Sequence, residues 1–94
     1  MCVVESSSAQ LVIKNRLGLH ARAAAKLVKA AGEYQADIRL INGDGAEADA
    51  RSVLSLISLG CDYDSRVTIA AEGVDARLAI SALSDIIEDR FGED

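Results

Sequence analysis

The stretch RLGLHARAAAK, residues 16–26, holds the residues best suited to chemistry. His20 is the only histidine of the chain, and it stands directly before an alanine-rich run, with Arg22 two positions later. If a helix begins at Ala21, His20 lies at its N-cap, where the first main-chain N–H groups have no partner within the helix. Those N–H groups and the guanidinium of Arg22 can hold an anion beside the imidazole nucleophile. The stretch therefore predicts transient phosphoryl transfer at His20.

The sequence lacks the residue patterns of other common catalytic and metal sites. A histidine at a helix start is often only a solvated or capping residue, and these residues alone leave that interpretation open. No nucleophile and carboxylate can be assigned to a hydrolytic triad with His20, and the chain has no P-loop, GxGxxG or HExxH motif. Cys2, Cys61 and His20 have no close spacing, so they make a poor zinc site. We expect neither a metal nor a cofactor.

Composition narrows the class of protein. The chain has 94 residues, enough for one small domain, and a formal net charge of −5, which argues against nucleic-acid binding. No apolar run approaches the length of a membrane span, and the start MCVVESSSAQ has no basic region typical of a signal peptide. The two cysteines are interpreted as reduced thiols. We expect a cytoplasmic monomer.

Hydrophobic periodicity predicts a mixed fold. Polar residues 5–10 predict a loose segment, so a flexible arm of residues 1–9 is expected before a single domain of residues 10–94. The order of predicted elements is strand, helix, strand, strand, helix, strand, helix, which favours an α+β fold with helices covering one face of a sheet. Strands are predicted over 11–15, 37–41, 46–50 and 66–73, and helices after His20, Ser52 and Asp75.

Local signals refine these elements. The turn NGDG, residues 42–45, predicts a hairpin between the second and third strands. Ser52 and Asp75 are natural N-caps for the second and third helices. In the second helix, Val53, Leu56, Ile57 and Gly60 share one side, while Leu54 falls off it and is expected to be exposed.

Three segments together resemble one family. GLHAR followed by an alanine-rich helix closely resembles the active-site segment of HPr, the histidine phosphocarrier of the bacterial phosphotransferase system. ARSVLSLISLG resembles the regulatory segment of that family, a serine at the start of a short helix. VTIAAEGVDARLAISAL resembles its last strand and final helix. The resemblance covers most of residues 11–88, and three such segments in this order are jointly very specific.

The resemblance implies a fold and a chemistry. The fold would be an open-faced sandwich, a four-stranded antiparallel sheet with three helices on one face, in the order βαββαβα. Enzyme I, charged from phosphoenolpyruvate, would phosphorylate His20 on Nδ1, and the chain would pass the group to a histidine of a sugar-specific IIA domain. Arg22 would be the active-site arginine, and the amides of Ala21 and Arg22 would contact phosphate. Such a chain is a carrier and not an enzyme.

The resemblance also implies regulation and docking. Ser52 would match the serine that an HPr kinase/phosphorylase modifies, which links the family to carbon catabolite regulation and transcriptional regulators. Val53 and Leu54 would belong to an apolar patch that binds partners, and Lys26 and Lys29 are the basic candidates on that face.

The chain departs from the family pattern in several places. Ala23 stands where the family usually has proline, and the N-terminal arm is longer. The NGDG turn is also expected to be longer, and the partner face has fewer basic residues than in sugar-transport members. Two alternatives therefore stay open. One is a regulatory branch that signals nitrogen or carbon status without sugar transport, and the other is a non-catalytic binding module in which His20 is incidental.

Overall fold

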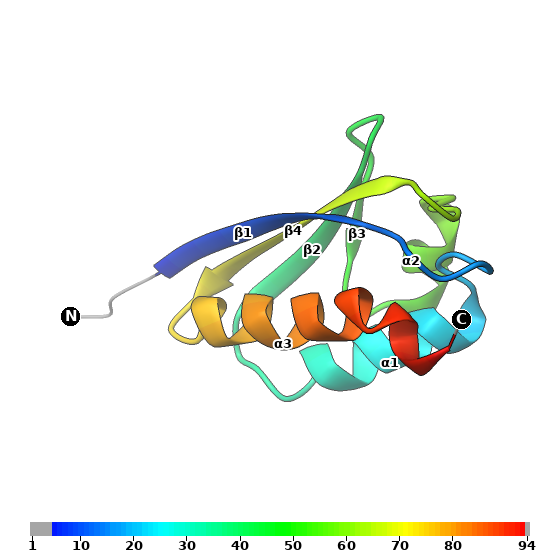
Figure 1. The fold of residues 1–94 in the computed structure, drawn as a ribbon. Coiled ribbons are helices and arrows are strands. Elements are labelled where there is room, and N and C mark those ends of the chain that lie inside the picture. The colour runs from blue at the N-terminus through cyan, green and yellow to red at the C-terminus, as the bar shows by residue number, and fades with distance from the viewer. Residues whose placement is uncertain (1–4, 94) are drawn as a thin grey trace.

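The computed structural model describes residues 5–93 and contains four strands and three α-helices (Figure 1). The element order βαββαβα is the predicted one. A single 3₁₀ turn, η1, follows the last helix. The strands are β1 (Glu5–Val12), β2 (Asp37–Asn42), β3 (Glu47–Asp49) and β4 (Arg66–Gly73). The helices are α1 (Ala21–Ala31), α2 (Val53–Ser58) and α3 (Ala76–Glu88), and η1 spans Arg90–Gly92.

The strands form one antiparallel sheet in the spatial order β1-β4-β2-β3. Helices α1 and α3 run beneath the same face of this sheet, and α2 lies near one end of it (Figure 1). Alternate strand residues such as Leu40 and Ile69 are completely buried against the helices, as period-two strands require. The predicted open-faced sandwich, with its helices on one face, is confirmed.

The core is aliphatic apart from one aromatic side chain. The predicted stripe of α1 is buried at Ala24, Leu27 and Ala31, and α3 buries its own stripe of alanine, leucine and isoleucine residues. Phe91, in η1, is 1% exposed. The C-terminal turn is therefore tied to the core by a large side chain.

The first strand begins earlier than predicted. Residues Glu5–Gln10 pair with β4, Glu5 opposite Gly73, so the expectation of a loose arm is wrong for residues 5–9. The side chains are small and polar, but a strand is held by main-chain hydrogen bonds, and the alternately exposed Ser6, Ser8 and Gln10 suit an edge strand. Residues 1–4 of the expected arm lie outside the described residues. The strand also ends at Val12, three residues before its predicted end.

Two local predictions about helices need correction. Ile57 of α2, predicted on the inner side, is 37% exposed, and Leu59 just beyond the helix is buried instead. This helix is only six residues long, so its short inner side is filled by Leu56. Asp75 does precede α3, but its carboxylate accepts hydrogen bonds from the amides of Gln35 and Ala36 and caps no amide of its own helix.

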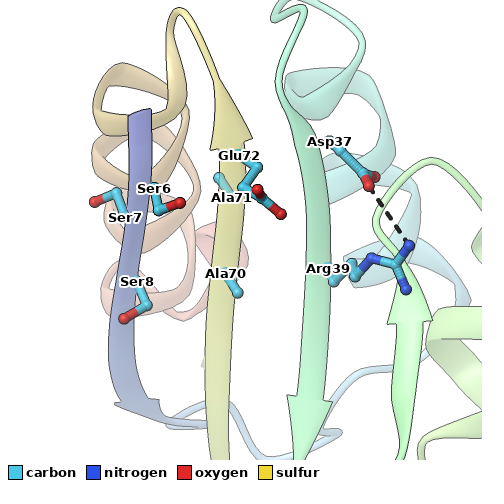
Figure 2. A pocket seen from close by; sticks show the side chains of 8 residues that line it. All are labelled: Ser6, Ser7, Ser8, Asp37, Arg39, Ala70, Ala71 and Glu72. Atoms are coloured by element: carbon cyan, nitrogen blue, oxygen red, sulfur yellow. Dashed lines mark hydrogen bonds and ion pairs between the residues drawn. The ribbon is translucent and has the colours of Figure 1, made fainter. Parts of the chain in front are cut away.

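The sheet face opposite the helices is polar. Figure 2 shows a shallow hollow there, lined by small side chains of β1 and β4 beside Asp37, Arg39 and Glu72. Arg39 pairs with Asp37 at 3.5 Å and with Glu47 at 3.6 Å, which offsets the repulsion between the neighbouring carboxylates. Among residues 5–93 there is no helix long and apolar enough to cross a membrane.

Candidate functional site

His20 is the N-cap of α1, as predicted. Its backbone is extended, with φ −84° and ψ 179°, and its Nδ1 accepts a 3.3 Å hydrogen bond from the main-chain amide of Arg22. The ring thus satisfies one of the amides that a helix start leaves free. Nδ1 lies at the positive end of the α1 dipole, where negative charge is stabilised.

The loop before His20 bends at a position, Gly18, that only glycine can occupy without strain. Gly18 has φ +66°, and a Cβ at this position would lie 2.6 Å from the carbonyl oxygen of Cys61. The close approach allows the amide of Leu19 to donate to that same carbonyl at 2.8 Å. The loop after α2 and the loop before α1 are therefore locked together immediately beside His20.

A carboxylate that the sequence did not indicate completes the site. Oε1 of Glu93 lies 2.8 Å from Nε2 of His20 and 2.9 Å from Nδ2 of Asn15. Asn15 is completely buried, and the same Nδ2 also donates to the carbonyl oxygen of Gly18 at 2.7 Å. Because both neighbours of this nitrogen are acceptors, the orientation of the amide is fixed. Asn15 therefore holds the carboxylate of Glu93 over the histidine ring.

The surroundings lower the pKa of Glu93. The Asn15 hydrogen bond is the main cause, followed by the hydrogen bond with His20, and the charge of Arg22 adds to both. Glu93 is therefore ionised at neutral pH and acts only as an acceptor. Nε2 of His20 must then carry the proton it donates, which leaves the lone pair on Nδ1.

The C-terminal turn delivers Glu93 to this position. Arg90, Phe91 and Gly92 have φ values of 56°, 56° and 73°, a left-handed run in which two residues are not glycine. The side chain of Phe91 is buried, and Nζ of Lys26 donates to its carbonyl oxygen. These two anchors reverse the chain after α3 and bring it to the N-terminal end of α1 (Figure 1).

The remaining predicted residues fall into two groups. Ala21 and Arg22 form the first turn of α1 beside His20, and both are exposed. Within residues 5–93 the guanidinium of Arg22 forms neither a hydrogen bond nor a close ion pair, so it is available to an incoming anion. Lys26 has the internal contact just described, whereas Lys29 is exposed beside the groove between α1 and α3.

Ser52 lies away from His20. It is the N-cap of α2, and its hydroxyl accepts a 3.3 Å hydrogen bond from the amide of Ser55, as predicted. The neighbouring Arg51 donates to carbonyl oxygens of Ala31 and Tyr34, at the C-terminal end of α1. The far end of α2 is the one that reaches the His20 loop. Ser52 and His20 are thus at opposite ends of the surface formed by α1 and α2.

The apolar surface between those ends is partly exposed. Leu54 is 78% exposed, as predicted, and Val53 is half-buried. Leu17, in the loop before His20, is 64% exposed and was not singled out from the sequence. The sequence carried a signal for Leu17, because this leucine belongs to no predicted strand or helix that could bury it.

Metal-ligating side chains and thiols can be described for residues 5–93. The part of the chain that the structure describes contains no cluster of three or more metal-ligating side chains. Cys61 is buried, and burial is the main reason that its thiol pKa is raised, with the nearby charge of Asp62 acting in the same direction. The thiol is therefore a poor nucleophile.

Comparison with known proteins identifies close relatives. The family model described as "PTS HPr component phosphorylation site" matches residues 7–89. A phosphocarrier protein NPr of Proteus mirabilis is 40% identical over 90% of this chain and 94% of its own length. A phosphocarrier protein HPr of Xylella fastidiosa is 36% identical over the same shares. The crystal structure of an HPr from Thermoanaerobacter tengcongensis superposes with a TM-score of 0.88 at 39% identity, covering 94% of this chain and 98% of that one.

Proposed function

We propose that Nδ1 of His20 accepts the phosphoryl group from enzyme I, because the chain belongs to the HPr family and is a phosphocarrier of the phosphotransferase system. The chain then passes the group to a histidine of a IIA domain. The observation that carries this proposal is the position of Nδ1, which holds a lone pair at the N-terminus of α1 beside Arg22. The group is carried and released, so the chain is not a turnover catalyst by itself.

The proposed transfer uses the lone pair of the unphosphorylated ring. The lone pair of Nδ1 attacks phosphorus, and the bond that joins phosphorus to enzyme I breaks, with its electron pair returning to enzyme I. Negative charge on the phosphoryl oxygens then faces the first amides of α1, those of Ala21 and Arg22, and the guanidinium of Arg22. The hydrogen bond that Nδ1 accepts from Arg22 is lost, and a phosphoryl oxygen can accept from this amide instead.

The docking surface is proposed to consist of Leu17, Val53 and Leu54 with the charges of Arg22 and Lys29. The apolar members are exposed or half-buried and lie beside His20 or on α2. Lys26 is a weaker candidate for docking than the sequence indicated, because its ammonium holds the C-terminal turn. We further propose that phosphorylation of Ser52 by a dedicated kinase adds charge at the edge of this surface and weakens partner binding.

A regulatory branch is the second candidate function. The NPr of Proteus mirabilis shares 40% identity with this chain, the same identity as the HPr of Cupriavidus necator. The proposed partner surface is also poor in cations once Lys26 is assigned an internal role. In this alternative His20 carries the same phosphoryl group, but the acceptor is a regulatory IIA domain and no sugar is moved.

Phosphorylation with labelled phosphoenolpyruvate tests the proposal. Incubation with enzyme I should give the chain an acid-labile, base-stable label, as a phosphohistidine does, and His20→Ala should abolish it while keeping the circular dichroism spectrum. Ser52→Ala is the matched control and should keep the full label. Label on His20→Ala, or an unlabelled parent chain, would contradict the assignment. Transfer from the labelled chain to a sugar-specific or to a regulatory IIA domain then separates the two branches.

A further inference from the structure

We infer that Glu93 is a positioning residue for His20, a role that rests on the proposed phosphoryl transfer. Its carboxylate oxygen lies 2.8 Å from Nε2, on the side of the ring away from the helix amides. One ring nitrogen thus faces a donor, the amide of Arg22, and the other faces an acceptor. This pair of contacts fits one neutral tautomer only, with the proton on Nε2 and the lone pair on Nδ1.

The contact is a built feature of the fold. Asn15 is the one buried polar residue within residues 5–93, and its Nδ2 donates one hydrogen bond to the carboxylate of Glu93. The same Nδ2 donates its other hydrogen to the carbonyl oxygen of Gly18, so the amide is held between two acceptors. Asn15 is thus placed to orient the carboxylate of Glu93. The left-handed turn anchored by Phe91 supplies that carboxylate from the other end of the sequence.

The same contact acts on the transfer step itself. When Nδ1 forms its bond to phosphorus and keeps the proton on Nε2, the ring becomes a cation. The carboxylate of Glu93 then faces this new positive charge directly, so the hydrogen bond becomes charge-assisted at both ends. No proton has to move during the step. Glu93 therefore fixes which nitrogen attacks and stabilises the ring as the bond forms.

Two variants of Glu93 separate its charge from its hydrogen bond. Glu93→Gln keeps an acceptor oxygen but loses the charge, and Glu93→Ala loses both. Glu88→Gln is the matched control, because it removes the same charge from an exposed carboxylate that pairs with Lys14. Phosphorylation by enzyme I should slow by about ten-fold in Glu93→Ala and less in Glu93→Gln, and Glu88→Gln should keep the parental rate.

A measurement on the unphosphorylated chain tests the inference independently of enzyme I. In ¹⁵N-labelled protein, the Nε2 proton of His20 should be protected from exchange in the parent and in Glu88→Gln, and exchange rapidly in Glu93→Ala. If the parent takes no label from enzyme I, the proposed function fails, and this readout still reports on the contact. Equal protection in all variants would overturn the inference. So would an unchanged or faster transfer in folded Glu93→Ala, where faster transfer would mean that the carboxylate repels the phosphoryl group.

Discussion

The carboxylate of Asp75 accepts a 2.8 Å hydrogen bond from the main-chain amide of Ala36, although 39 residues separate them. A second bond, from the amide of Gln35, is 2.9 Å long. The start of α3 is thus tied to the loop that leads into β2. These bonds lower the pKa of Asp75, with the Gln35 hydrogen bond as the largest cause.

We predict from this pKa shift that Asp75 contributes stability at neutral pH and loses it in acid. A depressed folded-state pKa means that the contribution is complete above the unfolded value of about 3.9 and is lost as pH falls through the lower folded value. Asp75→Asn should therefore reduce the free energy of unfolding at pH 7, and the gap to the parent should narrow near pH 3. Urea unfolding at both pH values measures this. Asp44→Asn, in the exposed hairpin turn, should have nearly the same free energy of unfolding as the parent at both pH values.

Arg22 is predicted to support transfer more than folding. Its guanidinium is exposed and beside the N-terminus of α1, so it can stabilise charge on the phosphoryl group. Arg22→Ala should slow phosphorylation by enzyme I ten-fold or more, about 1.4 kcal/mol or greater, with little change in thermal unfolding. Arg22→Lys should have an intermediate phosphorylation rate, because lysine keeps the positive charge but lacks the paired N–H donors of the guanidinium. Arg77→Ala, exposed on α3, is the control, and equal rates for the two alanine variants would count against the role.

Ser52 is predicted to combine a cap with a switch. Ser52→Ala removes the hydrogen bond to the amide of Ser55, so it should lower stability by about 0.5–2 kcal/mol and leave transfer intact. Ser52→Asp should keep a cap and slow phosphorylation of His20 markedly, because it places charge beside the exposed Leu54 that a partner must desolvate. The rate at which each variant takes up label from enzyme I distinguishes a cap from a switch. If Ser52→Asp accepts the group as fast as the parent, Ser52 is structural only.

Gly18 is predicted to be essential for the geometry of the His20 loop. Gly18→Ala introduces a side chain at φ +66° and 2.6 Å from the carbonyl oxygen of Cys61, so the loop must shift. The left-handed conformation alone costs about 1–2 kcal/mol, and the displaced loop should slow phosphorylation as well. Gly43→Ala is the control, since a Cβ there meets nothing within 4 Å and stability should change by less than about 0.5 kcal/mol. Chemical denaturation of both variants provides the test.

The sequence predicted those features whose cause is local. The stripe of α1, the cap at His20 and the alternation of β4 each arise from neighbouring residues, and each is confirmed. The start of β1 was missed, because a polar edge strand is held by its partner and not by its own side chains. Glu93 was missed for the same kind of reason, since it meets His20 across 73 positions. The left-handed turn that brings it there uses Arg90 and Phe91, which give no turn signal.

The left-handed C-terminal turn also sets the order in which parts of the molecule open. Among the described residues, the amides of Gly92 and Glu93 donate to the carbonyl oxygens of Asp89 and Arg90, within the single 3₁₀ turn η1 and directly after it. Local opening of this turn has to release Phe91 from the core and break the Lys26 contact, but it leaves the sheet and α1 folded, so its free-energy cost lies below that of global unfolding. Hydrogen exchange should accordingly be faster at Gly92 and Glu93 than in β4 at the centre of the sheet. The environment of the histidine ring is thus governed by a local opening equilibrium, so it can change at temperatures where the fold as a whole is still intact.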